Sequence, residues 1–184
     1  MFSTLGKIVL YGTFLLVFVH GQLVCAEQIL SNPELQKIDS KGIPAEWLFY
    51  PWGQERQINT LPANKSESGL YVSQKGFIDG GIRIFQKVSL VERKRYRAEL
   101  TLKTQGDLRI LVRFLIGGHE FNETIHPKNN SETQNIQVEL IAPGSGMGDF
   151  AIDIYGDGEI WLEKVTLQPI APIAEKEFSL QTEK

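Results

Sequence analysis

Residues 82–102 read IRIFQKVSLVERKRYRAELTL and contain two alternating segments of apolar and polar side chains around a short basic turn. A period of two places successive side chains on opposite faces of a β-strand. The two rows that we expect to face the core are Ile82, Ile84, Gln86 and Val88, and Tyr96, Ala98, Leu100 and Leu102. This stretch therefore predicts two half-buried strands joined at an exposed turn.

The same period continues through the rest of the chain. Its rows are Leu108, Ile110, Val112, Phe114 and Ile116; Ile136, Val138 and Leu140; Phe150, Ile152 and Ile154; and Ile160 with Val165 and Leu167. Turn chemistry separates them at Asp79-Gly80-Gly81, Gln105-Gly106-Asp107, Gly117-Gly118, Pro143-Gly144-Ser145-Gly146 and Gly156-Asp157-Gly158. Short strands at this spacing predict an all-β sandwich or barrel.

The N-terminus reads as a targeting segment. Lys7 precedes an apolar run, Ile8–Val19, and Val24-Cys25-Ala26 supplies small or modest residues for cleavage. This run is shorter than the roughly 20 residues of a membrane-crossing helix. We expect a signal peptide over residues 1–26, a secreted or periplasmic protein and no membrane span after cleavage. A retained anchor is one alternative, and a lipid on Cys25 is another, although Val24 is bulky for that cleavage.

The remaining 158 residues contain no cysteine, so their fold depends on a hydrophobic core. That length suits one domain, which we expect over residues 27–168, followed by a charged, Pro-containing tail over 169–184. Without Lys7, 18 basic residues face 22 acidic ones, a formal charge of −4. This balance does not support a general nucleic-acid or anionic-membrane surface.

Signs of catalysis are missing from the sequence. It contains no Gly-x-Ser-x-Gly elbow, phosphate loop or dinucleotide fingerprint. The polar segment 117–133 predicts a long loop, and His119, Glu120, Glu123 and His126 within it suggest a metal site. Their spacing is not that of a zinc protease helix. We therefore expect a noncatalytic protein that requires no cofactor.

Short motifs occur in a fixed order along the chain. They are Asn32-Pro33-Glu34-Leu35, Gly42-Ile43-Pro44 with Trp47, Gly69-Leu70-Tyr71-Val72-Ser73, Ile84-Phe85-Gln86-Lys87-Val88, residues 96–104, and residues 158–167. In this order they resemble galactose-binding-like jelly-roll domains, and more narrowly the carbohydrate-binding modules of families four, nine and twenty-two. The resemblance spans Ile29 to Pro169. It implies a jelly-roll β-sandwich of two antiparallel sheets.

The resemblance also implies a structural calcium ion near the two chain ends, with Glu34 and Glu163 at the matching positions. Many relatives carry an acidic pair where this chain has Glu163-Lys164. Because calcium prefers several oxygen ligands, a lysine there opposes binding. Alternatively, Glu34 and Glu163 are solvated glutamates at the edge of a sheet and bind no ion.

Sugar recognition needs flat apolar surfaces for pyranose rings beside planar polar groups. Tyr50 and Trp52, in the aromatic segment 47–52, are one candidate pair, whereas Trp47 fits a core position. Strand parity provides a second set on the faces opposite the core rows. If these strands share one sheet, that set is Arg83, Phe85, Arg109, Arg113, Asp153 and Tyr155.

The sequence thus predicts a secreted, noncatalytic carbohydrate-binding protein for a polysaccharide or glycoconjugate. The arginines favour acidic sugars, since guanidinium forks match carboxylate or sulfate. Alternatively, loops cover the apolar members and the arginines pair with Glu139 or Asp153. The same sandwich would also suit a protein-interaction or cell-envelope assembly module with a protein partner.

Overall fold

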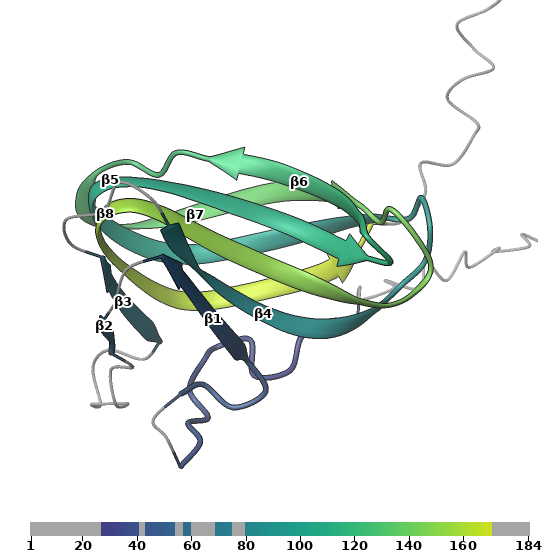
Figure 1. Ribbon diagram of the computed structural model, residues 1–184, viewed down its shortest axis with the longest axis horizontal. Helices are drawn as coiled ribbons and strands as arrows, with labels where there is room; N and C mark the ends of the chain where they lie inside the picture. The colour runs from purple at the N-terminus through teal and green to yellow at the C-terminus, as the bar shows by residue number, and fades with distance from the viewer. Residues whose placement is uncertain (1–26, 41–42, 54–56, 60–68, 75–79, 171–184) are drawn as a thin grey trace, which may run out of the picture.

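A computed structural model describes residues 27–40, 43–53, 57–59, 69–74 and 80–170 (Figure 1). All of the regular structure in these residues is β, and they include no helix long and apolar enough to cross a membrane. The predicted signal peptide and its cleavage site lie outside the described residues, as do residues 171–184 of the predicted tail.

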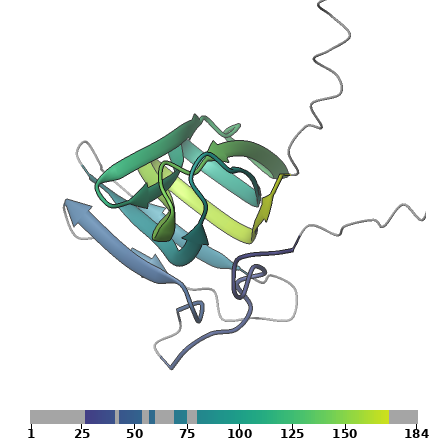
Figure 2. The same ribbon diagram turned by 90° about the vertical axis from the view of Figure 1, so that its right-hand side faces the viewer.

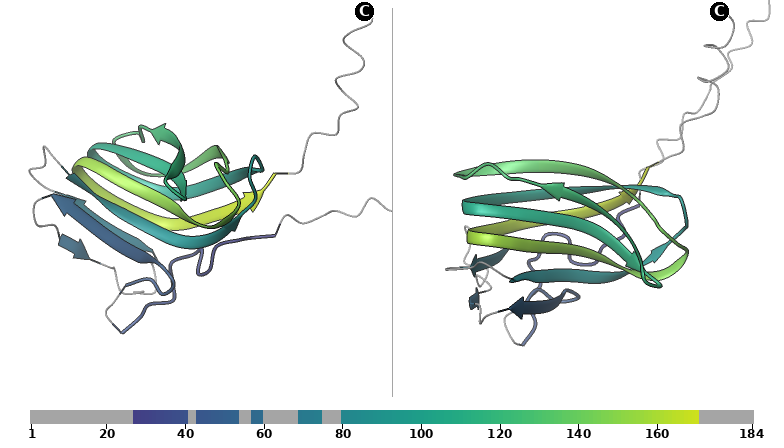
Figure 3. Two further views of the ribbon diagram at one scale, coloured as in Figure 1. Left: turned by 45° about the vertical axis from the view of Figure 1, so that its right-hand side comes forward. Right: turned by 45° about the horizontal axis from the view of Figure 1, so that its top comes forward.

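The described part of the chain contains eight strands. They are β1 (Leu48–Gly53), β2 (Gln57–Asn59), β3 (Leu70–Gln74), β4 (Gly80–Leu90), β5 (Arg95–Ile116), β6 (His119–Ile125), β7 (Asn130–Ile141) and β8 (Gly146–Pro169). All strand pairs are antiparallel. The first sheet runs β1-β4-β8-β5-β6, and the second runs β7-β5-β8-β3-β2. The two layers face each other across the core (Figures 2 and 3), which confirms the predicted jelly-roll sandwich.

Strands β5 and β8 belong to both sheets and remain paired as they pass from one to the other (Figure 1). At the crossing, Gly106 lies opposite Gly158, and Leu108 lies opposite Gly156. A Cβ on Gly156 would overlap the carbonyl oxygen of Asp107, and one on Gly158 would overlap that of Gln105. Glycine is therefore needed where the two bent backbones approach closely.

Two turn predictions were consequently wrong. Gln105-Gly106-Asp107 lies inside β5, and Gly156-Asp157-Gly158 lies inside β8. Gly-containing segments that look like turns in sequence here allow two long strands to bend together, because glycine tolerates both positive φ and close backbone contact.

The predicted binding loop over residues 117–133 was also wrong. Gly117 and Gly118, with φ values of 56° and 83°, form a tight turn that starts strand β6. Positive φ at both central residues suits the turns that join hairpin strands. The segment then folds back on β5, with Phe114 opposite Phe121.

The predicted core rows are confirmed. Their buried members include Ile82, Ile84, Leu100, Ile110, Val112, Ile152, Ile154 and Leu167, whereas Ile116, Ile136 and Val138 are only partly buried. Phe114 lies near the centre and contacts the rings of Tyr96 and Phe150 edge-on, at centroid distances of 5.2 and 6.0 Å. Such edge contacts add to the stabilisation from burial.

Residues 27–40 and 43–47 pack across one side of the sandwich, where Ile29 and Pro33 hydrogen-bond with the end of β8. Trp47 is buried, as predicted, and its indole N–H donates to the carbonyl of Asn32. The Gln86 amide holds the same segment, because it donates to the carbonyl of Ser31 and accepts from the Ser31 N–H, at 2.6 and 3.0 Å. Gln86 is therefore a structural residue on the core row.

Candidate functional site

One face of the first sheet brings together all eight residues that we predicted for sugar binding. We call this surface the platform; its members are Tyr50, Trp52, Arg83, Phe85, Arg109, Arg113, Asp153 and Tyr155. Their neighbours along the strands, such as Ile84 and Ile152, are fully buried in the core. Alternation along each strand therefore turns the platform residues away from the core.

The strand register sets their arrangement. Tyr50 of β1 lies opposite Arg83 of β4, and Arg83 lies opposite Asp153 of β8. Farther across the sheet, Tyr155 lies opposite Arg109 of β5. Residues that are far apart in sequence thus form continuous rows across four strands.

Asp153 is the electrostatic centre of the platform. Its carboxylate has no exposed surface and receives two hydrogen bonds from Arg83, at 2.7 and 3.0 Å. Arg113 also donates to it, and the other side of that guanidinium donates to Glu120 at 3.1 Å. Two arginines on different strands therefore compensate one buried carboxylate, as burial of a charge requires.

These contacts correct the expected role of Arg113. Only 9% of the residue is exposed, and its guanidinium is paired with two carboxylates. Arg83 is likewise paired, with 26% of its side chain exposed. The alternative in which Asp153 pairs with the arginines is therefore right for these two, whereas Glu139 pairs instead with Arg95 and Arg97.

Arg109 differs from the other two arginines. It is exposed, and among the described residues its only interaction is with the ring of Tyr155, which lies 4.6 Å from its guanidinium carbon. A cation over an aromatic face is attracted by the ring quadrupole. The platform thus presents a single guanidinium without an ion pair, far less free positive charge than three arginines suggest.

An aromatic corner forms at the same end. The rings of Trp52 and Tyr155 meet edge-on, with centroids 5.4 Å apart and an interplanar angle of 74°. Gly81 lies opposite Trp52, and a Cβ there would approach the indole ring to 2.5 Å. The missing side chain gives Trp52 room to lie against β4, so Trp52 and Gly81 form a matched pair.

Burial also affects the titration of this cluster. Burial raises the pKa of the Asp153 carboxyl above its usual value, while hydrogen bonding and the charge of Arg83 oppose the shift. Burial, followed by the charge of Asp153, raises the pKa of Tyr155. The Tyr155 hydroxyl therefore stays protonated at neutral pH and donates to Asp153, at 3.4 Å.

Both predicted calcium ligands are ion-paired with lysines. Glu34 pairs with Lys164 at 2.7 Å, and Glu163 pairs with Lys103 at 2.9 Å. Within the described segments, no three acidic, histidine or cysteine side chains gather in a metal-binding group. These donors do not fit an ion that prefers several oxygen ligands. The histidines and glutamates around β6 form no such group either.

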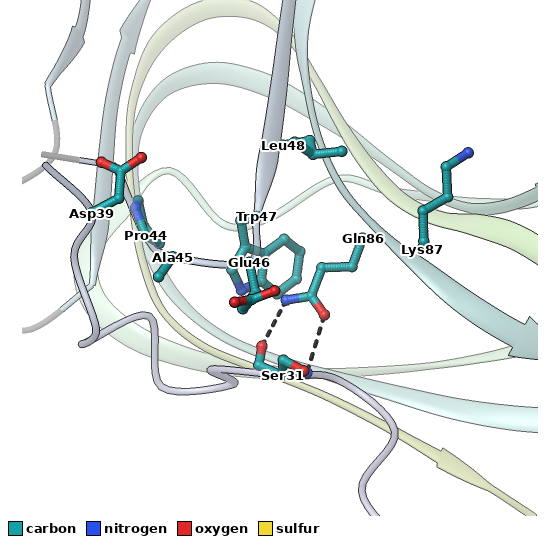
Figure 4. Close-up of a pocket in the computed structure, with 9 residues that line it drawn as sticks. All are labelled: Ser31, Asp39, Pro44, Ala45, Glu46, Trp47, Leu48, Gln86 and Lys87. Atoms are coloured by element: carbon teal, nitrogen blue, oxygen red, sulfur yellow. Dashed lines mark hydrogen bonds between the residues drawn. The ribbon is translucent and has the colours of Figure 1, made fainter. Parts of the chain in front are cut away.

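Two features of the site were not predicted. One is Glu120, which accepts a hydrogen bond from Arg113 and so extends the ion-paired cluster around Asp153. The Gly117-Gly118 turn was the sequence signal that could have placed Glu120 on a strand beside β5. The other feature is a pocket of about 500 Å³ where the N-terminal segment crosses the edge of β4 (Figure 4). It lies beyond Leu48, the first residue of β1, and no sequence motif indicated it.

Comparison with solved structures finds the same fold in other proteins. A family 61 carbohydrate-binding module solved with β-1,4-galactotriose aligns with 79% of this chain and all of its own, at 15% identity and a TM-score of 0.58. The fold is that of carbohydrate-binding modules. A family 4 module aligns over 76% of this chain and 99% of its own, at 15% identity and a TM-score of 0.57.

An enzyme shares the fold as well. The enzymatically active domain of tailspike protein 4 from bacteriophage CBA120 aligns over 78% of this chain but 21% of its own, at 13% identity and a TM-score of 0.58. No protein-family model matches the sequence, and no curated protein matches it either. The carbohydrate-binding-module-like sandwich is therefore established by structure, and its activity is a separate question.

Proposed function

We propose that this protein is a secreted or periplasmic, noncatalytic module that binds a polysaccharide or glycoconjugate on the platform. The observation that carries the proposal is the aromatic corner of Trp52 and Tyr155 beside the Arg109 guanidinium. Aromatic rings cover the C–H faces of sugars, and planar polar groups pair with hydroxyls. Structural neighbours solved with oligosaccharides add support.

The charge pattern favours a largely neutral glycan. Arg83 and Arg113 are already paired with carboxylates, so they offer a ligand little free charge. Arg109 can orient one hydroxyl or one acidic substituent. This replaces the expectation of a strongly acidic glycan, because that expectation counted three free arginines.

The same pairing supports a noncatalytic role. A glycosidase needs one carboxyl group that protonates the leaving group and another that reaches the sugar or a water. Asp153 is fully buried beneath its arginines, and Glu120 is hydrogen-bonded to Arg113. Asp153 is therefore not an open acid–base group, and Glu120, although exposed, is held by Arg113.

Replacing Trp52 with alanine is expected to weaken binding to a neutral glycan about tenfold, because sugar stacking on the corner is lost. Binding can be measured by calorimetry after screening a glycan array at low and high salt. Trp161→Ala is the matched control, since Trp161 contacts the ring of Tyr71 in the second sheet, at a centroid distance of 5.0 Å.

Equal losses in the two tryptophan variants would place the sugar elsewhere or show a general effect on folding. Binding that falls steeply with salt would contradict a mostly neutral ligand. If the native protein binds no glycan on a broad array, the carbohydrate proposal fails and a protein-interaction role becomes the better explanation.

A further inference from the structure

Exposed apolar side chains gather in two places on the described surface. Leu48 and Tyr50 lie on β1, at the edge of the platform. The other large apolar residues with high exposure are Val91, Ile141 and Met147, which expose 54%, 40% and 65% of their surface. These three lie at one end of the sandwich, where β4 leads into β5 and β7 leads into β8. Apolar residues that gather in this way often mark an interaction surface.

This end is built from three connections between strands. The Arg93 N–H donates to the carbonyl of Ala142, and the Ala142 N–H donates to the carbonyl of Lys94, at 2.9 and 3.0 Å. The turn after Ile116 lies beside them, because a Cβ on Gly144 would approach the Ile116 side chain to 3.2 Å. We call this surface the basic end; it consists of residues 91–95, 117–118 and 141–147.

The basic end carries positive charge that the described residues leave largely uncompensated. Arg95 pairs with Glu139. Arg93, by contrast, has 90% of its side chain exposed, and Glu92 lies 3.7 Å from it in an exposed ion pair, which contributes little. Lys94 lies over an aromatic ring and has no carboxylate partner among the described residues. This end is therefore locally basic in a chain that is acidic as a whole.

Arg93 also has a backbone conformation that arginine does not favour. The Lys94 N–H donates to the carbonyl of Val91 at 3.0 Å and closes a four-residue turn, in which Arg93 is the third residue with a φ of 61°. Positive φ at that position favours glycine or asparagine. Such strained residues concentrate at functional sites. The turn thus presents a guanidinium to solvent at a position where glycine would be less strained.

Both ends of the described chain lie on this side of the sandwich (Figure 3). The Ile29 N–H donates to the carbonyl of Leu167, and the Ile170 N–H donates to that of Arg95, at 3.0 and 2.9 Å. In the sequence, the apolar run Ile8–Val19 ends eight positions before the first described residue. Eight residues of chain reach at most about 29 Å. A membrane that receives this run therefore lies on the side of the basic end.

We propose that the basic end binds an anionic lipid surface. Lipid phosphates pair with Arg93 and Lys94, while Val91, Ile141 and Met147 enter the headgroup region. Ile141 follows buried Leu140 and so projects outward from the second sheet, whereas Met147 projects outward from the first. A fluid lipid surface suits such separated side chains better than a rigid protein groove does.

The orientation leaves the platform accessible. Gly81, beside the aromatic corner, lies nine residues along β4 from Leu90 at the basic end, a distance of ~30 Å. With the basic end on a membrane, the aromatic corner is directed away from the lipid. The lipid inference does not depend on glycan binding and adds a second surface to the protein.

Vesicle sedimentation tests the proposal with protein expressed from the full chain. The vesicles contain phosphatidylcholine alone or phosphatidylcholine with an equal amount of phosphatidylglycerol. We expect tighter binding to the anionic vesicles, and we expect salt to weaken it. A retained apolar segment would add affinity for both kinds of vesicle, so the preference for anionic lipid is the quantity to compare.

Arg93→Gly and Lys94→Ser should each lower the affinity for anionic vesicles about fivefold, the contribution of one basic residue near such a surface. Arg93→Gly also relieves the positive φ, so its thermal unfolding temperature should not fall. Met147→Ser should lower the affinity about tenfold, since burial of the apolar side chain is lost. Lys128→Ser is the matched control, because Lys128 is exposed beside Thr104, near the β5–β8 crossing at the opposite end.

The outcomes separate lipid from other anions and the basic end from the platform. Equal binding to the two kinds of vesicle, or equal losses in Arg93→Gly and Lys128→Ser, would overturn the proposal. It is also overturned if a soluble acidic polysaccharide displaces the protein from vesicles and Met147→Ser binds like the native protein, because the surface then recognises anions without inserting into lipid. Glycan binding should be unchanged in Arg93→Gly, so failure here leaves the platform proposal standing.

Discussion

The Gly156→Ala variant is expected to lose about 4 kcal/mol or more of folding free energy, a large share of the stability of an ordinary domain. Gly156 has a φ of 99°, and an added Cβ would overlap the carbonyl oxygen of Asp107 on the paired strand. A backbone oxygen cannot move aside as a flexible side chain can. Urea unfolding followed by circular dichroism measures the loss.

Gly117→Ala is the matched control, because Gly117 also has positive φ but no atom within 4 Å of an added Cβ. We expect this variant to lose only about 1–2 kcal/mol, the cost of a left-handed backbone conformation in alanine. Similar stability losses in the two variants would show that positive φ, rather than the close approach of β5 and β8, determines the need for glycine at the crossing.

The second large effect is expected from Arg113→Ala, which should destabilise the fold by about 3 kcal/mol, since removal of one partner leaves a buried charge poorly compensated. Asp153 keeps Arg83, so the loss lies at the lower end of the range for broken buried pairs. Arg109→Ala should change stability by less than about 0.5 kcal/mol, as a surface substitution does. Denaturant unfolding of the three proteins gives both values.

The pH dependence of this loss provides a sharper test. Burial already raises the pKa of Asp153 in the native fold, and removal of Arg113 should raise it further. The folded state then binds the proton more tightly than the unfolded state, so stability is retained below the unfolded pKa and falls as pH rises through the folded pKa. The difference between native protein and Arg113→Ala should therefore shrink as pH falls toward 4 and grow toward neutrality. A difference independent of pH would assign the loss to packing instead.

The sequence predicted which side chains face the core and which face outward, because alternation is a local property. Rows such as Ile82, Ile84 and Val88 could be assigned to the core without knowing the neighbouring strands. Alternation along β4, β5 and β8 likewise identified most of the platform residues. The resemblance contributed the further step that these strands share one sheet.

The sequence could not predict the contacts that depend on how the strands are paired. Gly106 and Gly156 resemble turn residues individually, and only their alignment across β5 and β8 reveals a crossing. Arg113 likewise looks like a free surface arginine, because Asp153 lies 40 positions later and meets it only through the register. Local patterns therefore identified which residues lie on the platform. How much of their charge a ligand can use depends on ion pairs that form only in the folded protein.

The sharing of β5 and β8 between the sheets also has a kinetic consequence. Their pairing runs from Tyr96, opposite Pro169, to Leu115, opposite Asp149, and so joins residues 73 to 34 positions apart. Such long-range contacts slow folding, since a large loop must close before either layer gains its partner. Neither sheet can open without breaking the hydrogen bonds between β5 and β8. The amides at its centre should therefore exchange with solvent only through global unfolding, whereas those of β1 and β2 exchange through local opening.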